Sequence, residues 1–348
     1  MRVLVLGGTG FLGPPLVERL IALGHEVTVF HRGGASADTL AGVPRILGDR
    51  NRLDQHVDEF RRLRPDIVVD ALAFTQKQAQ GLVDAFRGVA GRVVVLSSGD
   101  VYRANDILFH RVEGPIEATP LQESSPLRER LFPYRGIPIP QAYGIEWDDY
   151  DKILVERTVL TDGLLPATVL RLPMVYGPGD FQGRKRRFAA YLKRMDDGRE
   201  AMLLDQRTAQ WKAPWGYTEN IAEAVRLAVE SDRAAGQIYN VCELGRPDML
   251  SWVHGVAAAA GWAGRIVVVD ELCPPPNLPR HMNLDQHLDM DSSKIRNELG
   301  YREIVQRKEA LARTVAWDRS HPPEETDPAQ FDYAAEDEAW RLARRRAP

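Results

Sequence analysis

The sequence has few cysteines, no long apolar run and almost no excess charge. Only two cysteines, Cys242 and Cys273, occur in 348 residues, which is too few for a disulfide framework, and their spacing matches no metal motif. No run of about 20 apolar residues is present, and the first residues form a strand-like run without a signal-peptide pattern. We therefore expect a cytoplasmic protein that does not enter the membrane.

The formal net charge is -4, which is small for this length and makes nucleic acid an unexpected partner. One basic run, GRKRR at 183–187, stands out locally. The histidines show no zinc-type spacing, as with His281 and His287, so we expect no metal. The sequence is 44% hydrophobic and 27% charged, a composition that can bury one large core or two modest ones.

Short apolar runs alternate with helical patterns through the first half of the chain. Strands are predicted at 2–7, 25–30, 66–70 and 91–98, and helices at 13–24 and 77–88. Near-continuous Val and Leu in the strands is typical of strands buried on both faces. The alternation predicts an α/β fold with a Rossmann-type, doubly wound parallel sheet.

The remainder of the chain mixes helical and strand patterns. The segment 103–142 has no clear periodicity, which favours a long loop that serves a site. A helix is predicted at 148–161, a strand at 167–172 and a solvated helix at the C-terminus. We expect a mainly dinucleotide-binding domain over 1–175 and a smaller, mainly substrate-binding lobe over 176–348, with segments near 205–245 returning to the sheet.

The stretch LVLGGTGFLG places Gly7, Gly10 and Gly13 between the first predicted strand and the first predicted helix. Glycines in this position allow a tight turn and a close approach of the backbone to phosphate, while the helix N-terminus offers free N–H groups. A strand, a glycine-rich turn and a helix in this order predict a dinucleotide site.

The end of the second strand bears on the choice of dinucleotide. An acidic residue there typically binds the ribose 2′-hydroxyl, whereas Arg suits a 2′-phosphate. The sequence reads VFHRGG, with His31 and Arg32 and no acid. The expected cofactor is therefore NAD or NADP, with NADP favoured. Asp49, after another short strand, is a candidate partner for the adenine amino group.

These motifs resemble the short-chain dehydrogenase/reductase superfamily, in its extended, atypical branch of NAD-dependent epimerases and dehydratases. The resemblance covers most of the chain: GGTGFLG is similar to the cofactor loop, VVVLSSGDVY to the strand with the catalytic Ser, and DKILVE to the helix with the Lys. LRLPMVYGPGD, YTENIAEAVRLAV and DSSKIRNELGY resemble later landmarks.

The resemblance implies roles for individual residues. Ser98 would orient the reacting oxygen and Lys152 would bind the nicotinamide ribose, with Glu156 at the usual spacing. Further cofactor contacts would come from Thr9, Phe11, Leu12, Ala71, Leu72, Ala73 and Pro173. The family's Tyr lies four residues before its Lys, and here that position is Asp148.

Three residues are candidates for the missing phenol's role. Asp148 would share a helix face with Lys152, either as a general base or in a plain helix ion pair. Tyr143 precedes the predicted helix, and a loop phenol could reach the site. Tyr102 has a weaker claim. Tyr150 would lie about 200° from Lys152 around a helix, so we expect it to pack.

The substrate side is less specific. Ala213 stands where nucleotide-sugar members of the family carry an Arg, and the run Arg184, Lys185, Arg186, Arg187 either binds a phosphate or carboxylate or forms a solvated face. Trp211 and Trp215, on either side of Lys212, either line a pocket or pack in the core. We expect a small-molecule substrate, with phosphorylated or nucleotide-linked compounds included, and leave a homodimer open.

Together these patterns predict an NAD(P)-dependent oxidoreductase or isomerase of the epimerase/dehydratase type, acting at a carbinol or keto carbon of a sugar-like or other small molecule. The alternative is a Rossmann-fold protein that binds a nucleotide or RNA and has lost redox chemistry, because fold alone does not decide function.

Overall fold

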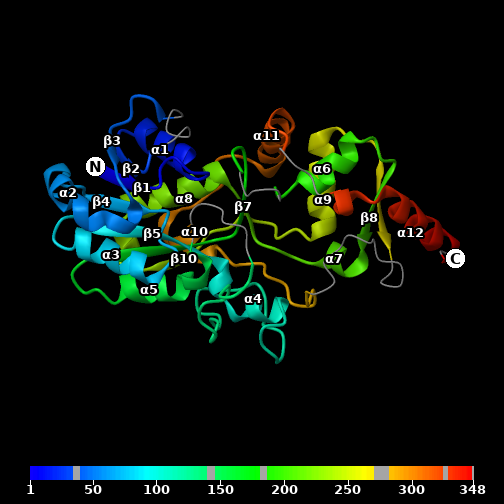
Figure 1. The fold of residues 1–348 in the computed structure, drawn as a ribbon, viewed down its shortest axis with the longest axis horizontal. Coiled ribbons are helices and arrows are strands. Elements are labelled where there is room, and N and C mark those ends of the chain that lie inside the picture. Colours follow the sequence, from blue (N-terminus) through cyan, green and yellow to red (C-terminus); the bar gives the residue numbers. More distant parts are fainter. Residues whose placement is uncertain (34–39, 139–145, 181–185, 270–281, 324–327, 347–348) are drawn as a thin grey trace.

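A computed structural model of the chain describes residues 1–33, 40–138, 146–180, 186–269, 282–323 and 328–346. It contains a seven-stranded sheet in the order β10-β6-β5-β4-β1-β2-β3 (Figure 1). Every pairing in this sheet is parallel. The strands are β1 (Arg2–Leu6), β2 (Glu26–His31), β3 (Arg45–Leu47), β4 (Ile67–Asp70), β5 (Arg92–Ser98), β6 (Ala167–Leu172) and β10 (Ile238–Asn240). The predicted doubly wound sheet is confirmed.

Helices cover both faces of this sheet. Helices α1 (Gly13–Ala22), α8 (Thr218–Glu230) and α10 (Ser293–Leu299) pack on one face, and α2 (Val57–Leu63), α3 (Gln76–Phe86) and α5 (Lys152–Leu160) on the other. Along β1, Val3 and Val5 enter the first core while Leu4 and Leu6 enter the second. Successive strand residues point to opposite faces, so a strand covered on both faces needs an unbroken apolar run.

A smaller lobe lies at the other end of the molecule, where the chain also ends (Figure 1). It contains two short parallel pairs, β8 (Ala201–Asp205) with β11 (Arg265–Val269) and β7 (Met174–Tyr176) with β9 (Trp215–Tyr217). Its helices are α6 (Ala189–Asp196), α7 (Gln206–Gln210), α9 (Met249–Ala260), α11 (Arg307–Ser320) and α12 (Tyr333–Arg346). Trp215 and Trp252 stack in its core with ring centroids 4.0 Å apart.

Short helices fill the connections. They are η2 (Arg50–His56), η3 (Gly99–Val101), α4 (Arg103–Leu108), η4 (Trp147–Asp149), η5 (Asp232–Ala234) and η6 (Pro328–Phe331). Helix α4 lies in a segment whose sequence has no helical periodicity, so that part of the loop prediction was wrong. Within the described ranges, no helix has the length and apolarity needed to cross a membrane.

Two helix predictions need correction. Helix α5 begins at Lys152 rather than at 148, because the Asp151 side chain accepts from the N–H of Ile153 at 2.8 Å and caps the helix there. The C-terminal helix α12 is not simply solvated, since Glu336 is buried and pairs with Arg194 of α6 at 2.5 Å.

Candidate functional site

The loop between β1 and α1 has the shape of a phosphate cradle. Gly7 adopts φ +91°, which favours glycine, and an added Cβ would lie 2.6 Å from the Leu72 side chain. A Cβ on Gly13 would lie 2.2 Å from the backbone of Gly8. A Cβ on Gly10, by contrast, would meet nothing closer than 3.8 Å. Two glycines therefore make the turn possible, and the third leaves the outer side of the loop open.

Helix α1 presents its N-terminus to this loop. No side chain caps the helix, and no acidic residue lies in its first turn. Within the described part of the chain, the N–H groups of Phe11 and Leu12 have no hydrogen-bond partner. Free N–H groups at the positive end of a helix bind anions. The loop thus fits a dinucleotide diphosphate, as the sequence predicts, and Thr9, Phe11 and Leu12 are partly exposed beside it.

Two basic residues, His31 and Arg32, stand at the end of β2, and they differ in exposure. His31 is buried, and its Nδ1 accepts from the N–H of Gly33 at 3.0 Å. Burial, together with Arg45, lowers the pKa of His31, which favours the neutral ring. Arg32 is exposed and forms no ion pair with any described residue.

A buried ion pair joins η2 to the carboxyl end of β4. Asp70 is fully buried, and it pairs with Arg50, whose guanidinium also donates to the carbonyl of Gln78 at 2.9 Å. The other Asp70 oxygen accepts from the N–H of Leu72 at 2.8 Å. The sequence analysis missed this pair, although an Asp ending an otherwise apolar strand is a usable signal.

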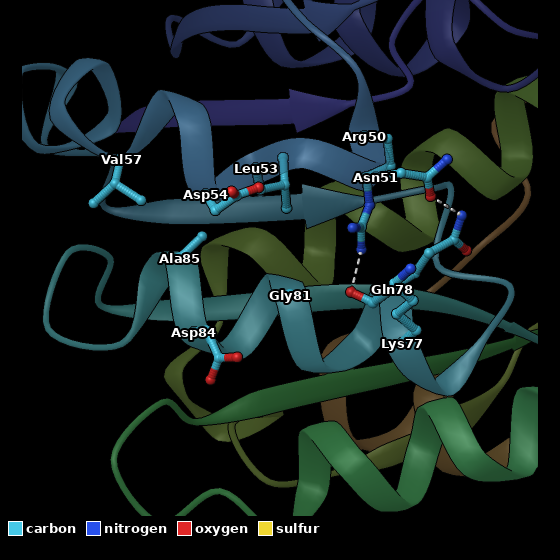
Figure 2. A pocket seen from close by; sticks show the side chains of 10 residues that line it. All are labelled: Arg50, Asn51, Leu53, Asp54, Val57, Lys77, Gln78, Gly81, Asp84 and Ala85. Atoms are coloured by element: carbon cyan, nitrogen blue, oxygen red, sulfur yellow. Dashed lines mark hydrogen bonds between the residues drawn. The ribbon is translucent and has the colours of Figure 1, made fainter.

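Asp49, the predicted adenine contact, is exposed and caps η2 by accepting from the N–H of Asn51 at 2.9 Å. A cavity of about 200 Å³ lies beside it, between η2 and α3 (Figure 2). Its lining includes Arg50, Asn51 and Gln78, and Asn51 bonds to Gln78 across it. The cavity therefore lies next to the predicted adenine contact, and its lining includes neither Ser98 nor Lys152.

Lys152 is buried at the N-terminus of α5. Only 4% of the residue is exposed, and Nζ donates to the carbonyl of Ala73 at 2.7 Å and to that of Leu96 at 2.8 Å. The ammonium also lies 4.4 Å from the ring centroid of Phe74. Ala71, Leu72 and Ala73 follow β4 directly, so the predicted cofactor contacts after this strand adjoin Lys152.

Burial lowers the pKa of Lys152 from 10.5 to about 8. Asp100, Asp70 and Glu156 oppose the shift, in this order of strength, and Arg50 adds to it. A buried ammonium is costly, so it is held by carbonyl oxygens and surrounded by carboxylates. Lys152 is therefore an ionisable group near neutral pH beside the predicted cofactor loop.

Comparisons with known proteins agree with this geometry. The pattern of the family described as "NAD dependent epimerase/dehydratase family" matches residues 3–127 and 149–242, which is more than half of the chain. The chain belongs to this family. It is an enzyme of the short-chain dehydrogenase/reductase type, and the family resemblance of the sequence is confirmed.

Individual relatives share less than a third of their aligned residues with this chain. The chain is 29% identical to the 2'-dehydrokanamycin reductase of Streptomyces kanamyceticus over 245 residues, which covers 69% of this chain and 61% of that reductase. The match thus spans less than two thirds of that relative. The 2-alkyl-3-oxoalkanoate reductase of Stenotrophomonas maltophilia is 28% identical over 279 residues, covering 75% of this chain and 76% of the relative.

The solved UDP-glucose 4-epimerase of Thermus thermophilus, in complex with NAD, has a TM-score of 0.62 and 25% sequence identity to this enzyme. The match covers 92% of this chain and 100% of that one. The likeness extends over both the sheet and the smaller lobe.

Asp148 does not lie where the sequence placed it. It is exposed in η4, before α5 begins, and its side chain accepts from the N–H of Gly136 at 2.9 Å. The expected shared helix face with Lys152 is wrong, because the Asp151 cap starts the helix too late. Its role as a general base loses that geometric support. Tyr143 lies outside the described residues, so its role stays a prediction.

Tyr150 does more than pack. Its backbone is extended before α5, and its hydroxyl donates to Asp100 at 2.7 Å. The sequence prediction placed Tyr150 and Lys152 on opposite sides of one helix. Tyr150 instead precedes the helix in an extended conformation, so that argument about its position does not apply. Tyr102 is buried in the fold and donates to Asn240 at 2.6 Å. This position does not support the weaker prediction that Tyr102 is the catalytic phenol.

Ser98 ends β5 at the same edge of the sheet as Gly7 and Asp70. It is partly exposed, and its Oγ accepts from the N–H of Asp100 at 3.2 Å. Pro173, the predicted contact after β6, is partly exposed and follows Leu172, which pairs with Ser98. The carboxyl ends of β1, β4, β5 and β6 therefore bring the predicted cofactor and substrate residues to one edge.

Glu156 has a structural role. It holds Arg171 of β6 with contacts of 2.8 Å and 3.0 Å and accepts from the Ser97 hydroxyl at 2.5 Å. All three side chains are buried. The network fixes α5 against β5 and β6, and so fixes the position of Lys152.

Several of the predicted substrate residues are engaged in contacts within the protein. Arg186 lies 4.8 Å from the ring centroid of Trp317, and Arg187 donates to the carbonyl of Val175. Arg184 and Lys185 lie outside the described residues. Trp215 packs in the core of the lobe, whereas Trp211 is partly buried and donates to the carbonyl of Gln286 at 2.9 Å. Of the two pocket candidates, Trp215 is therefore excluded.

Proposed function

We propose that this enzyme transfers a hydride between NADP(H) and a carbinol or keto carbon of a sugar-like or other small-molecule substrate. The observation that carries the proposal is the position of Lys152. Its ammonium lies at the carboxyl edge of the sheet, held by the carbonyls of Ala73 and Leu96, next to a glycine loop that fits a diphosphate.

The chain's own residues divide the work. Gly7, Gly10 and Gly13 shape the loop, and the N-terminus of α1 offers its N–H groups to the diphosphate. Lys152 binds the nicotinamide ribose, and Ser98 donates a hydrogen bond to the substrate oxygen. When bound, the nicotinamide supplies or accepts the hydride.

The preference for NADP(H) rests on Arg32. It is exposed at the end of β2, where the sequence VFHRGG has no acidic residue to bind a ribose 2′-hydroxyl. An exposed guanidinium binds phosphate with two hydrogen bonds. The two reductases among the relatives favour net reduction over internal recycling, and the substrate classes in their names are the first to test.

The first experiment identifies the dinucleotide. The protein is purified without added nucleotide and denatured, and the released cofactor is identified by mass spectrometry. We expect an empty site that binds NADPH on titration, followed by NADPH oxidation with ethyl 2-methylacetoacetate, a simple 2-alkyl-3-oxoalkanoate ester. Tightly bound NAD would instead favour an epimerase or dehydratase that recycles its cofactor. Failure to bind either dinucleotide would refute the proposal.

A Lys152→Ala variant tests the assignment of the site. We expect it to lose turnover and to bind the dinucleotide more weakly, since the ribose anchor is gone. Lys308→Ala is the control, because Lys308 is an exposed lysine on α11 in the smaller lobe. Full activity of Lys152→Ala would contradict the assignment.

A further inference from the structure

A buried carboxylate lies between two phenols next to Ser98. Asp100, in η3, is 9% exposed, and its Oδ2 accepts from the hydroxyl of Tyr150 at 2.7 Å and from that of Tyr134 at 3.3 Å. Its Oδ1 is buried and has no hydrogen-bond partner among the described residues. Charged groups with an unused oxygen are costly to bury, so such a carboxylate needs an explanation.

The carboxylate belongs to the same site as Lys152. After burial, Asp100 has the largest effect on the Lys152 pKa, which it raises. The ring of Phe74 lies close to both Lys152 and Tyr150, with its centroid 4.4 Å from the Lys152 ammonium and 6.2 Å from the centroid of the Tyr150 ring. Tyr150 is itself buried, with 6% of the residue exposed, and the neighbouring Ser98 and Phe74 are partly exposed, so the cluster lies one residue below the surface at the carboxyl edge of the sheet.

We propose that Tyr150 and Asp100 form the proton relay of this enzyme, in place of a Tyr four residues before the Lys. The inference rests on the proposed function. Tyr150 is the catalytic residue that contacts the substrate oxygen, and Asp100 acts through it. The geometry carries the assignment: a phenol that donates to a carboxylate keeps its oxygen lone pairs as acceptors.

The proton follows a balanced path. When an alcohol is oxidised, the substrate hydroxyl gives its proton to the Tyr150 oxygen, while the Tyr150 proton moves to Oδ2 of Asp100. The phenol ends neutral and Asp100 ends as a carboxylic acid. The substrate hydride leaves to the oxidised dinucleotide. When a ketone is reduced, Asp100 returns its proton through Tyr150 to the substrate oxygen, and the reduced dinucleotide supplies the hydride.

The relay avoids a charged phenol. Burial raises the pKa of Tyr150 well above 10, and Asp100 raises it further. The family's Tyr is tuned the other way, since the neighbouring Lys lowers its pKa. A phenolate next to the Asp100 carboxylate would place two anions in one buried site, which the concerted transfer prevents. Arg128 opposes these shifts of the Tyr150 pKa, and Lys152 interacts with the charge of Asp100.

Tyr134 provides a matched control. It also donates to Asp100, but at 3.3 Å, and its ring packs against that of Tyr150 with centroids 5.1 Å apart. It therefore shares the burial and the carboxylate but makes the longer hydrogen bond. A purely structural role of the cluster predicts similar effects from both phenols, whereas the relay predicts an effect from Tyr150 alone.

The experiment compares Tyr150→Phe, Asp100→Asn and Tyr134→Phe in the NADPH-dependent reduction of ethyl 2-methylacetoacetate. General acid catalysis contributes about 10²- to 10⁴-fold, so we expect Tyr150→Phe and Asp100→Asn to lower kcat by about 100-fold or more. NADPH affinity, measured by fluorescence titration without substrate, should stay within about threefold in Tyr150→Phe and Tyr134→Phe, which keep the Asp100 carboxylate that raises the Lys152 pKa, and Tyr134→Phe should keep its kcat. For Asp100→Asn, kcat is measured at saturating NADPH.

Chemical rescue separates proton transfer from folding. In Asp100→Ala, added formate should restore part of kcat, because a small carboxylate can enter the space and accept the proton. An unchanged kcat in Tyr150→Phe, or equal losses in Tyr150→Phe and Tyr134→Phe without rescue, would overturn the relay and leave the proposed function intact. Absence of turnover in the natural enzyme, with no dinucleotide bound, would overturn both.

Discussion

The ammonium of Lys152 donates to the carbonyl oxygen of Ala73 at 2.7 Å, which ties the start of α5 to the segment that follows β4. The same segment is held from the other side, where Asp70 accepts from the N–H of Leu72. Leu72 in turn packs against Gly7 of the glycine loop. The residues predicted to bind the two ends of the dinucleotide are thus connected through three consecutive residues, 71–73.

The ion pair of Arg50 and Asp70 should be essential for stability. Removing one partner leaves the other charge buried, which costs about 3–5 kcal/mol. We therefore expect Arg50→Met to lower the free energy of unfolding by this order and to weaken dinucleotide binding, because Asp70 then no longer holds the Leu72 segment firmly. Urea unfolding and a fluorescence titration with NADPH measure the two effects.

The control for this prediction is Arg52→Met. Arg52 and Asp54 form an exposed pair at 3.7 Å, so its loss should change little. Adding Asp70→Asn to Arg50→Met should recover part of the lost stability, since it removes the uncompensated charge. A double variant less stable than Arg50→Met alone would contradict this explanation.

The glycine loop should not tolerate a side chain at Gly13. A Cβ there would lie 2.2 Å from the backbone of Gly8, and backbone cannot move away as a flexible side chain can. We expect Gly13→Ala to abolish dinucleotide binding, as measured by calorimetry. Gly163→Ala is the control for binding, because Gly163 lies between α5 and β6, where a Cβ meets nothing within 4 Å, so dinucleotide affinity should not change. Gly81→Ala tests stability alone. Gly81 lies inside α3, where a Cβ meets nothing within 4 Å, so alanine should stabilise the enzyme by about 0.5–1 kcal/mol.

Arg32 should decide between NADPH and NADH. Hydrogen bonds to charged groups contribute about 1.5–3 kcal/mol, so Arg32→Ala should weaken NADPH binding by about 10- to 100-fold and leave NADH binding nearly unchanged. Arg61→Ala, an exposed arginine of α2 near the opposite edge of the sheet, should change neither affinity. Equal losses for both dinucleotides would show that Arg32 does not contact a 2′-phosphate.

The lowered pKa of Lys152 predicts two pH effects of opposite sign. The folded value is about 8 and the ordinary value is 10.5. Between these values the unfolded chain keeps a proton that the folded chain releases, so the contribution of Lys152 to stability rises with pH in this window. Below about 8 the full cost of the buried charge is present. Dinucleotide affinity should fall as pH rises through about 8, because the ammonium is lost.

Lys152→Met is the comparison for both effects. Unfolding by urea at several pH values should show the difference in stability between the natural enzyme and this variant shifting in favour of the natural enzyme as pH rises above about 8. The variant's dinucleotide affinity should not fall over that range. A constant difference in stability would mean that Lys152 keeps its ordinary pKa.

The sheet and its helices could be predicted closely from sequence, because burial on both faces leaves a local pattern. The predicted strand 167–172 coincides with β6, and the predicted helix 13–24 contains α1. The glycine loop was equally readable, because its glycines stand at a recognisable spacing between a strand and a helix. Helix α5 was predicted four residues too early, because the acidic run before Lys152 does not reveal which residue caps the helix.

The sequence by itself therefore determined the fold class and the glycine loop, since each follows from local periodicity or from a motif, and it predicted Ser98 and Lys152 as site residues. Tertiary structure alone decided the partners of the buried charges. Asp70 meets Arg50, Asp100 meets Tyr150, and Glu156 meets Arg171 across 20, 50 and 15 residues. Buried charges must find partners wherever the chain brings them together, and no local pattern encodes which residues those are.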